Sequence, residues 1–209
     1  MSRNVVKYAF LVCLLLLINL WGISAGQCSN FTTDITEETL WISLDVSPQQ
    51  KKQIDAIIAE SYSQVKKFHK KQGSNDIYDF NNLFILLQYT STMNDIRKST
   101  SDRIMQVLDT KQKLEFEKQL QQVKDASYKS TVLMLSLDLT DTQKKLVVTS
   151  LLKTQKKIWE ILSRKSSSWE EKRKKLNRIN KLQIVSAKLS KEQRTRMAQW
   201  NIMFSSDTY

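Results

Sequence analysis

The scarcity of glycine and proline limits the folds open to this chain more than any other feature. Its 209 residues contain three glycines and one proline, and after residue 26 only Pro48 and Gly73 remain. Tight hairpins, glycine-rich phosphate loops and β-sandwich corners need residues that accept a positive φ or fix a turn. The sequence therefore predicts an all-α protein. An apolar share of 41% is enough for a packed core and too low for a multispanning membrane protein.

The first 26 residues are predicted to be a leader rather than part of this fold. A basic start, an apolar run over residues 9–21 and a small-residue exit ending at Ala25 are typical of a secretory signal peptide. We therefore expect export, with cleavage after Ala25 or Gly26. An uncleaved anchor is also open, because residues 8–25 carry no charge. A lipid anchor on Cys28 is a further alternative, although Gln27 is not the small residue usually found before such a cysteine.

Charge is distributed unevenly along the rest of the chain. Residues 27–139 carry 14 bases and 15 acids, a net charge of −1, whereas residues 140–209 carry 17 bases and six acids, a net charge of +11. A strongly basic half attracts nucleic acid, anionic lipid or acidic polypeptide through its field. Export makes nucleic acid the least expected of these partners, and a membrane surface stays possible.

Apolar residues recur at helical spacing almost throughout the chain after the leader. They predict amphipathic helices over residues 47–71, 77–107, from 109 into the 120s or 130s, 140–165, 168–189 and 190–204. The polar stretch 91–101 is expected to bend or break the second of these. Ser168 and Glu171 form a capping signal at the start of the fifth.

Four of these helices begin with one shared pattern. Each start has an N-cap residue, a glutamine three positions later and then a base, and each follows a branched aliphatic residue. The four pairs are Ser47 and Gln50, Asp109 and Gln112, Thr140 and Gln143, and Ser190 and Gln193. Physically this is a capping box, in which the two side chains bond each other's backbone N–H groups. Glutamate would suit the positive end of a helix better, so the consistent glutamine indicates a constraint beyond helix initiation.

The four starts also group into two similar units. The segment 43–47 matches 136–140 at an offset of 93 residues, and the apolar positions of the following helices match at the same offset. A duplication explains this better than chance similarity between two basic helices. We therefore expect a first helical module over residues 27–135 and a second, basic module over residues 136–209.

These boxes resemble those of the LTXXQ-motif family of bacterial periplasmic proteins, which includes the Spy and CpxP chaperones. Residues 139–143, Leu-Thr-Asp-Thr-Gln, match the motif to the letter, while Val46, Ser47, Asp109 and Ser190 are conservative departures. The resemblance implies four-helix modules whose long bent hairpins build a thin cradle, usually by antiparallel dimerisation. It also implies a location in the periplasm, with secretion as the alternative, and ATP-independent binding of unfolded or aggregation-prone proteins in the envelope, or sensing of envelope stress. A duplicated chain could form such a cradle from its own two halves.

The expected function is accordingly binding rather than catalysis. A basic face would attract unfolded or acidic protein clients under envelope stress, with self-association possible. The bases predicted to form this client-binding face are Lys144, Lys145, Lys156, Lys157, Lys172, Arg173, Lys174, Lys175, Arg178 and Lys181. Alternatives are an envelope-stress regulator or specific-partner binding protein, and a secreted helical virulence or membrane-surface factor.

No catalytic or metal-binding constellation stands out in the sequence. The sole histidine, His69, is followed by lysines and has no histidine or cysteine at ligand spacing, so we expect no metal. A serine or cysteine triad is hard to build with one histidine and, after leader removal, one cysteine. We expect neither enzymatic activity nor a cofactor.

Overall fold

The computed structural model describes residues 36–72 and 83–206, and every regular element in these ranges is an α-helix. This confirms the predicted all-α class. The helices are α2 (Glu37–Trp41), α3 (Pro48–Gln72), α4 (Leu83–Val107), α5 (Thr110–Ser136), α6 (Asp141–Leu162), α7 (Trp169–Leu176), α8 (Lys181–Ser186) and α9 (Lys191–Ser206). The predicted leader, Cys28 and the first residues of the helix predicted over 77–107 lie outside the described residues.

The predicted break within residues 91–101 is wrong, because α4 runs unbroken through this stretch. Three of its polar residues, Arg97, Thr100 and Ser101, are buried, whereas Ser91, Asp95, Lys98 and Ser99 are exposed. The Thr100 hydroxyl lies 2.6 Å from the Ile96 carbonyl oxygen, one turn earlier, and 2.7 Å from the Ser61 hydroxyl of α3. One face of the polar middle of α4 therefore packs inside the protein, and its buried polar groups are bonded without a break in the helix.

The predicted helix over residues 168–189 is instead divided into α7 and α8. Asn177 ends α7 as its C-cap, and the Asn180 side chain accepts a hydrogen bond from the Gln183 N–H at the start of α8. Asparagine favours such caps because its short side chain bonds nearby backbone groups. The second predicted module thus has two short helices where the first has the long helix α4.

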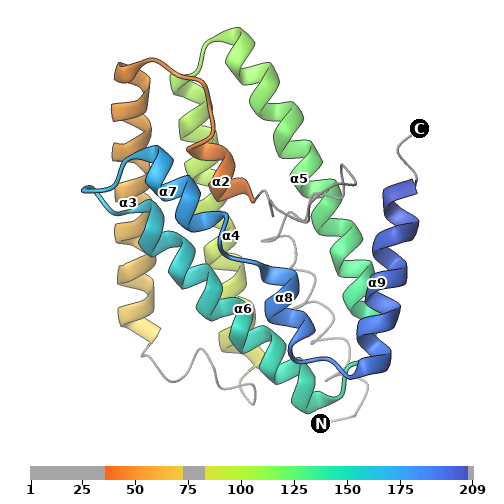
Figure 1. Cartoon of the computed structure of the whole chain (residues 1–209). Helices are drawn as coiled ribbons and strands as arrows, with labels where there is room; N and C mark the ends of the chain where they lie inside the picture. Colours follow the sequence, from red (N-terminus) through yellow and green to blue (C-terminus); the bar gives the residue numbers. More distant parts are fainter. Residues whose placement is uncertain (1–35, 73–82, 207–209) are drawn as a thin grey trace.

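The two sets of helices run in opposite directions. Helices α3 and α5 both begin at the upper end of the molecule in Figure 1, whereas α6 and α9 begin at the lower end. Helix α6 packs along α3, and α2 packs against both α4 and α5. The hydrophobic core includes residues of both predicted modules, from Ile54 of α3 to Met197 of α9.

Matching positions of the two predicted copies occupy similar environments. Ile54 and Val147 are both fully buried, and Ile58 and Leu151 are almost so. The residues just before the matched segments differ in structure, because Leu40 and Trp41 end the separate helix α2, whereas Leu133 and Met134 belong to the last turn of the long helix α5. The predicted boundary at residues 135 and 136 falls at the end of α5, and the division into two modules stays a prediction.

Candidate functional site: paired glutamines, a basic face and the seat of α2

The first two glutamine boxes bind each other. The Gln50 amide nitrogen donates to the Gln112 side-chain oxygen at 2.8 Å and to the Val107 carbonyl at 3.0 Å. In return, the Gln112 amide nitrogen donates to the Asp45 carbonyl at 2.8 Å and, more weakly, to the Gln50 oxygen at 3.4 Å. Each side-chain oxygen also accepts the N–H of its own N-cap residue, Ser47 or Asp109. We call this arrangement the first glutamine lock.

The other two boxes form a second glutamine lock of the same design. Gln143 donates to the Gln193 oxygen at 2.8 Å and to the Lys188 carbonyl at 3.2 Å. Gln193 donates to the Gln143 oxygen at 3.2 Å and to the Leu137 carbonyl at 2.9 Å. At the offset of 93 residues the counterpart of the Asp45 acceptor would be Asp138, so the Leu137 carbonyl lies one residue earlier. The turn of the second lock differs here, because Asp138 has a φ of 47°, in the left-handed region that aspartate tolerates.

The locks explain why these boxes contain glutamine. A primary amide has two donors and an acceptor oxygen, and every one of these is used in each lock. Glutamate could cap its helix but could not donate to its partner. The box of Ser168 and Glu171 agrees with this distinction, since it closes only on itself at the start of α7 and the structure gives it no partner box among the described residues.

The predicted basic face is mostly exposed, with two corrections. Lys145, Lys156, Lys157, Arg173, Lys174 and Arg178 are exposed, and Lys144 and Lys175 are half-buried. Lys172 and Lys181 are instead buried, at 3% and 2% exposure, so neither lies on an exposed face. The Lys172 ammonium lies 3.1 Å from the Asp55 carboxylate of α3. Helical periodicity could not separate these two from their neighbours, because α7 and α8 are short and lysine stems pack readily on apolar surface.

Helix α2 occupies a polar seat formed by side chains of α4 and α6. The carboxylate of Glu38 is fully buried and accepts from the Arg97 Nε of α4 at 2.7 Å and from the Gln155 amide of α6 at 2.6 Å. Burial alone would raise the pKa of Glu38, but the charges of Arg97 and Lys181 hold it below its ordinary value. Glu38, Arg97 and Gln155 were not predicted as a site, because each is an ordinary polar helix residue in the sequence.

Aromatic packing also holds α2 against α6. The Trp41 ring lies 5.4 Å from that of Trp159 on α6, and both side chains are fully buried. The Trp41 indole N–H donates to the Ser101 hydroxyl of α4 at 2.8 Å. Through Trp41, helix α2 therefore contacts α4 of the first predicted module and α6 of the second.

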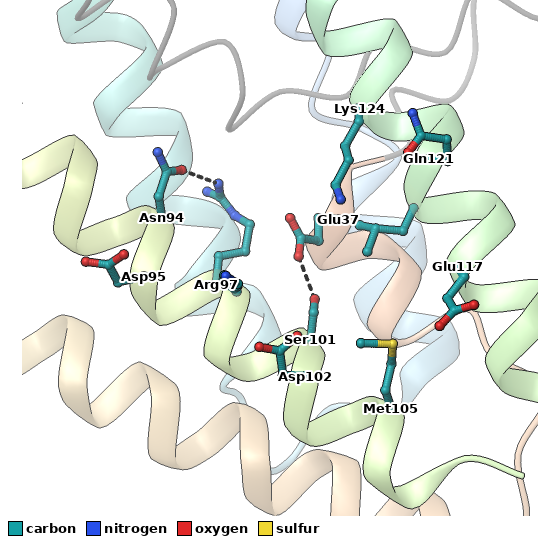
Figure 2. Close-up of a pocket in the computed structure, with 12 residues that line it drawn as sticks. Glu37, Asn94, Asp95, Arg97, Ser101, Asp102, Met105, Glu117, Gln121 and Lys124 are labelled. Carbon is teal, nitrogen blue, oxygen red and sulfur yellow. Dashed lines mark hydrogen bonds between the residues drawn. The ribbon is translucent and has the colours of Figure 1, made fainter.

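A pocket of about 530 Å³ lies between α4 and α5, with Glu37 of α2 in its wall. Figure 2 shows the Glu37 side chain between Arg97 and Lys124, and the Ser101 hydroxyl donates to its carboxylate at 2.5 Å. Burial raises the pKa of Glu37, against the opposing attraction of both cations. The neighbouring acids of α2 thus have pKa values displaced in opposite directions.

The raised pKa of Glu37 predicts a pH-dependent effect of Glu37→Gln. Above the raised pKa the charged carboxylate disfavours the folded state, so the variant should be more stable than the wild type at pH 7. As the pH falls through that pKa towards 4.5, the wild-type carboxyl takes up its proton and the difference should shrink. Urea denaturation followed by circular dichroism at several pH values measures this. A deficit of Glu37→Gln at pH 7 would contradict the prediction.

The described residues include no group of three potential metal ligands and no helix that could cross a membrane. The Nε2 atom of His69 lies 3.2 Å from the Tyr89 hydroxyl. Burial, together with the charge of Lys156, lowers the pKa of His69.

Comparison with known proteins adds no relative. No protein-family model matches the chain, and neither the curated proteins nor the solved structures contain a significant match.

Proposed function

We propose that this protein is an ATP-independent, chaperone-like binding protein of the periplasm, which holds unfolded or aggregation-prone proteins under envelope stress. The observation that carries the proposal is the set of exposed bases on α6 and α7, where the start of α6 is tied to that of α9 by side-chain amides. Long-range attraction would bring acidic, partly unfolded chains to this surface. No covalent step or cofactor is needed for such binding.

The distribution of exposed side chains supports weak rather than tight capture. Large exposed apolar residues among those described are few and scattered: Leu114, Tyr128, Leu135 and Leu146. A bound chain would therefore be held mainly by charge, with single apolar contacts. Weak contacts of this kind release a client easily, which suits a protein that protects unfolded chains without hydrolysing ATP.

The test is an aggregation-protection assay on several unrelated denatured proteins with a salt titration. We expect the quadruple variant Lys156→Gln, Lys157→Gln, Arg173→Gln and Lys174→Gln to need about tenfold more protein for half-protection, because it removes part of the attracting field. Protection by the wild type should weaken as salt shortens the range of this attraction.

A matched control removes four exposed bases from the first half: Lys52→Gln, Lys67→Gln, Lys111→Gln and Lys113→Gln. These positions are exposed in the structure, and the change in net charge is the same. The control should protect nearly as well as the wild type. Equal losses in both variants would mean that net charge alone matters, and no protection by the wild type would reject the proposal.

The pocket between α4 and α5 favours a second candidate, a protein that binds one specific partner. Its wall has mixed charge, with the acids Glu37 and Asp102 and the bases Lys98 and Lys124 among the lining residues, and mixed charge selects partners more strictly than a uniform field. Saturable binding to one protein, without protection of unrelated denatured proteins, would favour this candidate.

A further inference from the structure

We propose that α2 is a latch between the two copies, which leaves its seat and returns while both glutamine locks stay closed. The first ground is its length. Helix α2 has five residues, and an isolated helix this short is unstable in water, so its helical form depends on the seat. Its counterpart in the second copy is the end of the 27-residue helix α5 and cannot leave separately.

The second ground is the polarity of the seat. Glu38, Arg97 and Gln155 are each at most 2% exposed, and each has one polar atom without a hydrogen-bond partner within the described part of the chain: Glu38 Oε2, Arg97 Nη2 and Gln155 Oε1. Buried polar atoms left unpaired disfavour the closed state, because water would satisfy them on opening. Release of α2 therefore recovers hydration that an apolar seat would not offer, while Leu40 and Trp41 hold the latch shut.

The third ground is a fixed pivot. The first lock holds the chain directly after α2, because Gln112 bonds the Asp45 carbonyl and Gln50 bonds the Ser47 N–H. Rotation at residues 42–44 would free α2 without breaking either bond. Opening would uncover the Trp159 ring and the polar groups of Arg97 and Gln155, a combined apolar and charged surface. The latch does not depend on which partner the protein binds.

Hydrogen exchange of the chain without its predicted leader tests the latch. We expect the bonded amides of Leu40 and Ser43 to exchange at least about tenfold faster than those at the centre of α6, and with a weaker dependence on urea, as in local opening. Exchange of α2 and α6 at one rate with one urea dependence would show that α2 opens only by global unfolding, and would overturn the proposal.

Two matched variants separate the latch from general destabilisation. Glu38→Gln removes the buried anion that pairs with Arg97, so α2 should exchange several-fold faster still, while the Lys51 and Lys113 amides beside the first lock keep their rates. Glu60→Gln removes an exposed pair with Arg103 and should leave α2 unchanged. An equal increase in α2 and α6 exchange in Glu38→Gln would contradict the latch. Should that variant not fold, the wild-type comparison decides alone.

Discussion

Replacing Gln50 with glutamate is expected to lower the free energy of unfolding by about 2 to 4 kcal/mol, although glutamate is a good capping residue. The substitution keeps the shape of the side chain and removes two donors. The Gln112 oxygen and the Val107 carbonyl would then face a carboxylate in a half-buried place. Urea denaturation followed by circular dichroism at pH 7 measures the loss. At acidic pH the loss should shrink, because a protonated carboxyl can donate once.

The adjacent residue gives the control. Gln49 is exposed in the same first turn of α3, outside the lock. Gln49→Glu should be neutral or slightly stabilising, because an acid is favoured at a helix start. If Gln50 only capped its helix, both variants would change the free energy of unfolding by the same small amount. Equal stability of Gln49→Glu and Gln50→Glu would therefore leave the glutamines as ordinary caps.

The second large effect is expected at Trp159, which joins α6 to the seat of α2. Its side chain is fully buried against Trp41, so Trp159→Ala should lower the free energy of unfolding by about 3 to 5 kcal/mol through lost burial and the cavity left behind. Urea denaturation measures this as well. A loss below about 1 kcal/mol would mean that Trp159 does not pack in the core.

Trp159→Phe distinguishes packing from polarity at the same position. The indole N–H of Trp159 has no hydrogen-bond partner among the described residues, so phenylalanine removes an unsatisfied buried donor while it keeps an aromatic ring. We expect a loss of less than about 1.5 kcal/mol, well below that of the alanine variant. Similar losses in both variants would assign a role to the indole nitrogen.

The fold class and the helix starts could be predicted from the sequence because their signals are local. Scarce glycine and proline exclude most turns of β-structure, and capping residues mark helix starts within four positions. All four glutamine boxes lie at helix starts as predicted. The consistent choice of glutamine over glutamate already indicated a constraint beyond helix initiation.

The partners of those glutamines could not be predicted, because Gln50 and Gln112 are 62 residues apart and meet only after α3 and α4 fold back. The same holds for Glu38, whose partner Gln155 is 117 residues away. The break between α7 and α8 was not predicted, because the apolar pattern continues through it while Asn177 and Asn180 end one helix and begin the next. The exposure of a single lysine also depends on tertiary packing, which is why Lys172 and Lys181 were wrongly predicted to lie on the exposed basic face.

The most direct measurement of the paired glutamines is a double-mutant cycle, in which Gln143→Ala and Gln193→Ala are made singly and together. A lock predicts a coupling energy of at least about 1 kcal/mol within this pair, because either substitution alone already breaks the amide pair. The same cycle between Gln50 and Gln193, which belong to different locks, should give less than about 0.5 kcal/mol. Additive effects within the pair, with no more coupling than between the locks, would contradict the glutamine lock.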